Sequence, residues 1–198
     1  MKIAKIVKSN SHIDYIGRVI DSLDVADPPT SRDFGFANFV RLPLADETEI
    51  IGVIYNSILI NPEYANYGPR LSPKPELGSF SPDYLNEQGF LIGILLLGTK
   101  DREGEISHGV PHRVVPAGQE VFKLDAEAVR KFHTDGKDCL QIHYYSQVIA
   151  NAGNFAVPLL EAIIGQLNQN GCSENDKKRL DVLKQTLAWQ RTIGGMRL

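Results

Sequence analysis

Short runs of β-branched and aromatic residues alternate with polar turns over the first 60 residues. The runs are MKIAKIV (1–7), YIGRVID (15–21), FGFANFVRLPL (34–44) and EIIGVIYNSILI (49–60). Stretches rich in Ser, Asn, Asp and Pro, such as DVADPPTSRD (24–33), separate them, so the pattern predicts four strands. Gly17 and Gly52 interrupt two of the runs. A glycine inside a strand marks a bulge or sharp coiling, which favours a small closed barrel over a flat sheet.

The pattern is lost over residues 61–86, a segment with five prolines and no sustained periodicity. We expect a long surface excursion here. Such insertions in compact domains are often functional, so this one is a candidate partner-binding or subunit-clasping loop, and a variable loop without a role is an equal alternative. Its aromatic residues are suited to anchoring an interface or to pinning the loop onto the barrel: Tyr64, Tyr67, Phe80 and Tyr84.

Strand and turn signals return after residue 88. GFLIGILLLGTK (89–100) is continuously apolar between glycines, which predicts a buried strand, and DREGEIS (101–107) predicts a polar turn. Pro111 and Pro116 keep the next stretch extended until a short strand at 120–124. Asp125 then has the position of an N-cap for a short helix over 126–133.

The remaining chain predicts one more strand and two helices. LQIHYYSQVI (140–149) has strand composition, and Pro158 in a first turn precedes an apolar face at helical spacing that consists of Leu159, Leu160, Ile163, Ile164 and Leu167. Gly171 lies past the end of that helix. Ser173 caps a second helix with Asp176 as a weak capping-box partner and a stripe of Leu180, Leu183 and Leu187. We expect an α+β protein in which a small closed β-barrel domain (1–145) precedes a C-terminal helical pair (146–198).

Composition and charge narrow the functional classes. Apolar residues make up 42% of the 198, charged residues 23%, and the formal charge is −3. This balance is that of a soluble globular protein and gives no basic stripe of the kind that a dedicated nucleic-acid coat shows. The longest apolar run, 90–98, is too short for a membrane helix, so we expect no membrane association. Cys139 and Cys172 form no CxxC pair, which favours a reducing cytoplasmic compartment and no cysteine-built metal site.

The stretch VIANAGNFAVPLLEAIIGQL (148–167) raises the question of a phosphate-binding loop. A working loop follows the pattern G-x-x-x-x-G-K-[ST]. Counting five from Gly153 reaches Pro158, which has no N–H to donate, and no Lys or Arg occurs between Lys137 and Lys177. The sequence therefore argues against ATP hydrolysis at residues 151–158. Weak anion binding at the helix start stays open, although a helix docked on the barrel explains the apolar face more simply.

The other candidate residues do not form a catalytic or metal-binding set. His108 and His112 have H-x3-H spacing, but Pro111 argues against a helix there, so we expect solvated loop histidines and no metal. His143 has the features of a hydrogen-bonded core or interface side chain, with a ligand or base as the alternative. Asp101, Glu103 and Glu105 fall in one polar turn that we expect at the surface. We predict no enzyme activity, no cofactor and no catalytic residue.

The barrel segments resemble a known family. YIGRVIDS, EIIGVIYNSIL, GILLLG and VPHRVVPAGQEVFKLDAEAV are similar to the amino-terminal barrel (HAS-barrel) of HerA-type DNA-translocating ATPases, over roughly residues 10–130. The matching positions are Ile16, Gly17, Arg18, Val19, Ile51, Gly52, Val53, Ile54, Pro116, Gly118, Val121 and Asp125. The resemblance implies a barrel that assembles into rings and contacts protein partners. It does not imply motor activity, because the Walker Lys and Ser/Thr are missing.

Three functional hypotheses follow. The first is a non-catalytic oligomerisation or protein-interaction module within a DNA-processing assembly. The second is nucleic-acid binding through barrel loops that carry Arg18, Arg41, Arg70 and Arg113. The third is a small-molecule-binding protein or enzyme that uses His143 at the barrel mouth.

Overall fold

A computed structural model describes residues 1–60, 89–135, 139–169 and 174–194. The predicted excursion at 61–86, with Arg70 and the four aromatic residues named above, lies outside this part of the chain. Gly171, Cys172 and Ser173 lie outside it as well.

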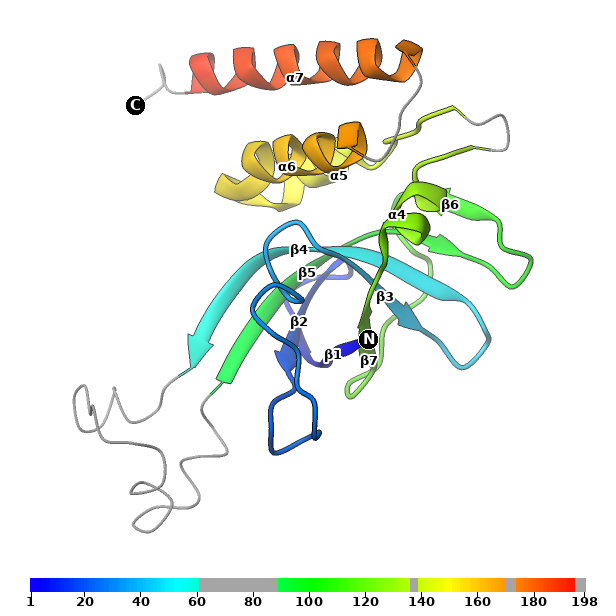
Figure 1. The fold of residues 1–198 in the computed structure, drawn as a ribbon, viewed down its shortest axis with the longest axis vertical. Coiled ribbons are helices and arrows are strands. Elements are labelled where there is room, and N and C mark those ends of the chain that lie inside the picture. Colours follow the sequence, from blue (N-terminus) through cyan, green and yellow to red (C-terminus); the bar gives the residue numbers. More distant parts are fainter. Residues whose placement is uncertain (61–88, 136–138, 170–173, 195–198) are drawn as a thin grey trace, which may run out of the picture.

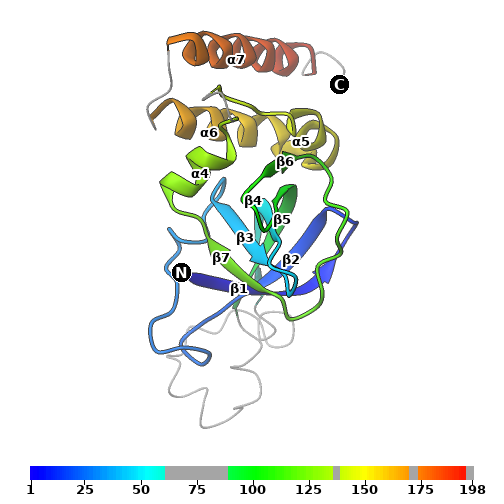
Figure 2. The same cartoon turned by 90° about the vertical axis from the view of Figure 1, so that its right-hand side faces the viewer.

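Six antiparallel strands close into a barrel (Figures 1 and 2). In chain order they are β1 (Lys2–Ser9), β2 (Asp14–Val19), β3 (Phe39–Pro43), β4 (Glu49–Ile60), β5 (Gly89–Lys100) and β7 (Glu120–Lys123). The sheet runs β2-β1-β7-β3-β4-β5, and pairing of β2 with β5 closes the ring. A short strand, β6 (Ile106–His108), adds to β5 at Gly98–Lys100, past the end of β2. The predicted closed barrel is confirmed.

The two glycines expected at bulges lie at irregular points of the ladder. The register of β1 against β2 shifts between Ile6 and Lys8, next to the pair Ile6 and Gly17. The register of β4 against β5 shifts between Ile51 and Gly52. A Cβ atom at Gly52 would lie 2.8 Å from an atom of Ile94. These irregularities increase the local twist that lets a six-stranded sheet close.

The third predicted strand begins later than expected, at Phe39 instead of residue 34. Ala37 has a left-handed backbone with φ 64°, which ends any extended run before Asn38. The Ala37 N–H donates to the Ile54 carbonyl, so residues 34–37 form a turn that is fastened to β4. The aromatic residues Phe34 and Phe36 therefore make ring contacts, and they do not take part in the sheet.

Strand β5 is buried on both faces over its middle. Ile92, Ile94, Leu95, Leu96 and Leu97 are all fully buried, although alternate residues of a strand point to opposite sides. One side faces the barrel interior, and a layer of helices covers the other (Figure 1). The continuous apolar run in the sequence is explained by this double burial.

The first helix, α4 (Ala126–Phe132), follows β7 as predicted. Asp125 is its N-cap, and the Asp125 side chain accepts a hydrogen bond of 2.8 Å from the Ala128 N–H. Val129 and Phe132 form its buried face. The cap and these two side chains fix α4 against the barrel end that carries β6.

The strand expected at 140–149 is wrong. The structure has α5 (Tyr145–Asn151) there, then a 3-10 turn at Gly153–Phe155, and the pairing that remains is an isolated bridge between Thr134 and Leu140. Tyr144, Val148 and Ala152 are buried at a spacing of four residues, which is a helical period. Burial of this face outweighs the β preference of the aromatic and β-branched residues.

The predicted helical pair is present as α6 (Ala156–Gln169) and α7 (Glu174–Gly194), which run antiparallel (Figures 1 and 2). The apolar face predicted for α6 is buried from Leu159 to Leu167, in the same core cluster as the barrel side chains. Leu180 and Leu187 of α7 are buried, and Leu183 packs against that cluster. Among the described helices, none combines the length and apolar character that a membrane span needs.

Candidate functional site

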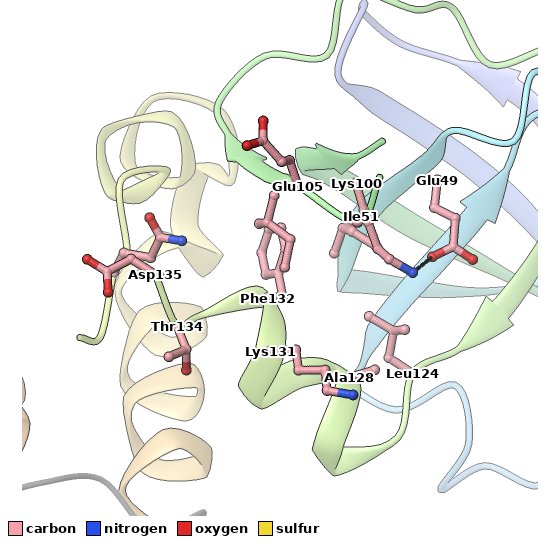
Figure 3. Close-up of a pocket in the computed structure, with 13 residues that line it drawn as sticks. Glu49, Ile51, Lys100, Glu105, Leu124, Ala128, Lys131, Phe132, Thr134 and Asp135 are labelled. Carbon is pink, nitrogen blue, oxygen red and sulfur yellow. Dashed lines mark hydrogen bonds and ion pairs between the residues drawn. The ribbon is translucent and has the colours of Figure 1, made fainter. Parts of the chain in front are cut away.

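A pocket of about 650 Å³ lies at the barrel end that α4 and β6 cover (Figure 3). Four segments line it: the paired ends of β4 and β5, the turn before β6, helix α4 with the residues around it, and Gln141. Its floor is apolar and includes Ile51, Leu124 and Phe132. Its rim is polar, with Glu49, Lys100, Glu105, Lys131 and Asp135. The size and the mixed lining are typical of small-molecule sites.

Ion pairs neutralise most of the rim. The Glu49 carboxylate forms ion pairs with Arg41 at 2.6 Å and with Lys100 at 3.2 Å. Lys131 lies 2.8 Å from Glu127 in an exposed i,i+4 pair on α4. Asp135 accepts a hydrogen bond of 2.8 Å from the Cys139 N–H. Glu105 is exposed and forms no ion pair with any residue that the structure describes.

A polar network lies next to Phe132 of the pocket floor. His133 is fully buried; its Nδ1 lies 2.7 Å from the Val129 carbonyl and its Nε2 lies 2.6 Å from the Tyr144 hydroxyl. A carbonyl only accepts, so we assign the proton to Nδ1, and Nε2 accepts from Tyr144. The His133 carbonyl in turn accepts from the Gln141 N–H. These bonds tie the end of α4 to the segment that leads into α5.

His108 extends the network to β6. Its Nε2 lies 2.7 Å from the Phe132 carbonyl, and its Nδ1 accepts a bond of 3.3 Å from the His143 N–H. The His108 ring lies 4.4 Å from the Phe132 ring and 5.2 Å from the Tyr144 ring, measured between centroids. Neither His108 nor His133 has an uncommitted ring nitrogen in this arrangement, so neither is poised to act as a general base.

Burial sets the protonation of this network. Desolvation lowers the pKa of His133 from 6.5 to about 4 and also lowers the pKa of His108. The pKa of Tyr144 is raised well above 10 by burial. At pH 7 both imidazoles are neutral and the phenol keeps its proton, which is the charge state that the hydrogen bonds require.

The structure corrects part of the prediction for the histidines. His108 is not a solvated loop residue: it lies in β6 and packs into the network, because the β5–β6 hairpin folds back over α4. His112 is exposed, as predicted. His143 is exposed, and its ring lies 5.7 Å from the His108 ring, while its side chain does not line the pocket. Sequence reasoning missed His133 and Tyr144 as partners, and the only available signal was the position of Tyr144 at the start of the i, i+4, i+8 face of Tyr144, Val148 and Ala152.

Three of the four arginines proposed for nucleic-acid contact lie in the described part of the chain, and each is paired with an acid. Arg18 lies 3.6 Å from Asp21, Arg41 lies 2.6 Å from Glu49 and Arg113 lies 2.8 Å from Asp46. The guanidinium of Arg41 also lies 4.9 Å from the Phe122 ring centroid. Each of these three side chains thus has a neighbouring carboxylate as its ion-pair partner.

The remaining candidates from the sequence are the segment 151–158, Asp176 and the acidic turn. Residues 151–158 connect α5 to α6, so a helix and not a strand precedes the turn. Gly153 takes φ +54° in this turn. Asp176 is buried and accepts a bond of 3.2 Å from the Leu140 N–H. Asp101, Glu103 and Glu105 are exposed, as predicted. No group of three metal-ligating side chains occurs within the described part of the chain.

The far end of the β4–β5 pair exposes apolar side chains. Ile58 and Leu59 of β4 and Phe90 of β5 are 50%, 64% and 43% exposed, and Leu59 pairs directly with Phe90. We call these three residues the apolar arm, because β4 pairs with β3 only as far as Val53, β5 pairs with β2 only as far as Leu91, and the two strands run on together beyond these residues (Figure 1). One aromatic contact involves the arm, and a second joins the turn at 34–37 to the 3-10 turn at Gly153–Phe155. Phe34 lies 5.5 Å from Phe90, and Phe36 lies 6.1 Å from Phe155, both between ring centroids.

Comparison with known proteins bears on the family. A model of one family, described as a domain of unknown function (DUF8166), matches residues 1–197. The chain belongs to this family. No curated protein matches the chain. The match extends from the first strand of the barrel through α7, so barrel and helices are parts of one family unit.

Proposed function

We propose that this chain is a non-catalytic protein-interaction module that self-associates through the apolar arm. The observation that carries the proposal is the exposure of Leu59 and Phe90, which lie side by side on a strand pair that runs beyond the barrel. Exposed aromatic and aliphatic side chains of this kind are enriched in protein interfaces and are unusual as a group on a monomer.

The proposal does not rest on the helices. The sequence predicts apolar faces on both helices, and α6 buries its face in the same core cluster as the barrel side chains. The apolar arm is a different surface, at the other end of β4. Its apolar side chains are exposed and can contact a partner, whereas the apolar face of α6 is already buried.

A second copy of the chain is the partner that fits best. Residues 55–60, YNSILI, carry no charge and so provide no pattern that would select a charged partner. Two identical apolar surfaces match each other about a two-fold axis. The Ser57 N–H already bonds to the Asn56 side chain at 2.8 Å, so we propose contact through side-chain faces and not through backbone pairing at the strand edge.

Other functions have less support. The three described arginines are engaged by carboxylates, which weakens the case for phosphate contacts. The buried imidazoles use both ring nitrogens, which gives an enzyme no ready acid or base among them. The resemblance to the HerA-type barrel stays a prediction and agrees with a module that assembles.

Light scattering after size-exclusion chromatography tests the proposal. We expect the wild-type chain to elute as a dimer or larger assembly and Leu59→Glu to elute as a monomer, because a charge in an apolar contact has no partner. Val182→Glu is the matched control, since Val182 is 61% exposed but lies on α7. A wild-type monomer at high protein concentration, or loss of assembly in the control alone, would overturn the proposal.

A further inference from the structure

The pocket at the β6 end has a polar feature that its ion pairs leave unbalanced. The two lysines of the rim are each paired, Lys100 with Glu49 and Lys131 with Glu127, and Glu49 has Arg41 as a second partner. Glu105 has no such counter-charge among the described residues. Figure 3 shows Glu105 beside Phe132, at the edge of the apolar floor. Counted over the charged lining residues and their ion-pair partners, four carboxylates (Glu49, Glu105, Asp135 and Glu127) stand against three cations (Arg41, Lys100 and Lys131), so the formal charge of the pocket is −1.

The two imidazoles next to Phe132 add no positive charge that would oppose a positive ligand. The His108 ring packs on Phe132, and burial lowers the pKa of His108 and brings the pKa of His133 to about 4. Both rings are neutral at pH 7. Gln141 also lines the pocket, and its side-chain oxygen can accept a hydrogen bond.

We infer that the pocket binds a small organic cation, a primary amine on an apolar body, with the amine at Glu105 and the body on Ile51, Leu124 and Phe132. The ammonium gains a carboxylate partner, and the apolar part leaves water against a preformed floor. Glu105 is exposed, so the charge contributes selectivity and the apolar floor contributes most of the affinity. The pocket and the apolar arm lie at opposite ends of the β4–β5 pair, so this binding does not depend on self-association.

Three probes of similar size and different charge test the inference: phenethylamine, 2-phenylethanol and phenylacetate. Titration calorimetry of the full chain at low salt should rank the amine first, about fivefold tighter than the alcohol, with phenylacetate weakest. The preference for the amine should shrink at 1 M salt. Equal binding of the three probes, stronger binding of phenylacetate, or no heat with any probe would overturn the inference.

Two substitutions separate the floor from the charge. Ala128→Trp fills the pocket from α4 and should abolish binding of all three probes, whereas Ala150→Trp, on the exposed side of α5, should leave binding unchanged. Glu105→Gln should remove the preference for the amine over the alcohol and keep the binding of the alcohol. Glu103→Gln is its control, because Glu103 lies in the same exposed turn and does not line the pocket. If Glu105→Gln keeps the preference, the assignment of Glu105 is wrong.

Discussion

The two ends of the β4–β5 pair differ in how their side chains are satisfied. At one end, β6, α4 and residues 140–144 cover the strands, and the imidazoles of His133, which is buried, and His108, which is half-buried, have hydrogen bonds at both nitrogens. No buried side-chain polar atom lacks a partner within the described residues. At the other end, Leu59 is 64% exposed and Phe90 is 43% exposed.

This difference separates a structural site from an interaction surface. A fully satisfied buried network stabilises one arrangement of its elements and leaves little capacity for further chemistry. An exposed apolar group has the opposite property, because covering it with another molecule lowers the free energy. The histidine and tyrosine network of His108, His133 and Tyr144 therefore has a structural role.

The largest expected effect is at Gly98, where β6 pairs with β5. A Cβ atom there would lie 2.2 Å from the Ser107 carbonyl oxygen and 3.2 Å from the Phe132 ring, so Gly98→Ala should destabilise the chain by about 3 kcal/mol or more. Gly89→Ala is the control on the same strand at the exposed end, where a Cβ atom meets nothing within 4 Å. Urea unfolding measures both. Equal costs at the two glycines would remove the contrast between the ends.

Acidification should weaken the covered end. Since the pKa of His133 falls from 6.5 in the unfolded chain to about 4 in the fold, the unfolded state binds more protons between these values. Stability is therefore complete above pH 6.5 and declines toward pH 4, by about 3 kcal/mol at most. Urea unfolding at a series of pH values follows the decline. The loss of stability between pH 6.5 and pH 4 should be the same in His112→Gln as in the wild type, because His112 is exposed, and it should be smaller in His133→Gln.

Removal of one hydroxyl should have a smaller effect. Tyr144→Phe leaves the buried Nε2 of His133 without a donor and should cost about 2 kcal/mol. Tyr55→Phe removes a half-buried hydroxyl that donates to Asp14 at 2.9 Å, close to the exposed end, and should cost about 1 kcal/mol or less. Thermal unfolding compares the two variants. A larger loss for Tyr55→Phe would show that the polar network is not the main constraint.

The smallest effect on folding belongs to the apolar arm. Leu59→Ser removes a side chain that is 64% exposed, so the free energy of unfolding of the monomer should change by less than about 0.5 kcal/mol. The same substitution should dissociate the assembly. Unfolding at low protein concentration, together with light scattering at high concentration, separates these outcomes. A large loss of monomer stability would place Leu59 in the core.

The barrel was predictable from sequence because its signals are local. Glycines at bulges, Asp125 before a helix, and continuous burial from Ile92 to Leu97 each follow from a few neighbouring residues. Strand preference misled at 140–149, where the buried face of Tyr144 and Val148 decides the helix, and at 34–38, where the backbone turns at Ala37.

The site could be predicted only in part. The partnership of His133 with Tyr144, the place of His108 over Phe132 and the pocket between β4, β6 and α4 depend on contacts between segments far apart in the chain. The apolar character of YNSILI was visible, but its exposure depends on where β3 and β2 end, which sequence patterns did not fix.

Hydrogen–deuterium exchange at two protein concentrations tests the central claim most directly. We predict that peptides covering residues 55–60 and 89–92 exchange more slowly at the higher concentration, because a second copy covers them. Peptides covering 126–133 and 140–148 should exchange at the same rate at both concentrations. Unchanged exchange at 55–60 and 89–92 in a sample that is shown to associate would place the interface elsewhere and contradict the account.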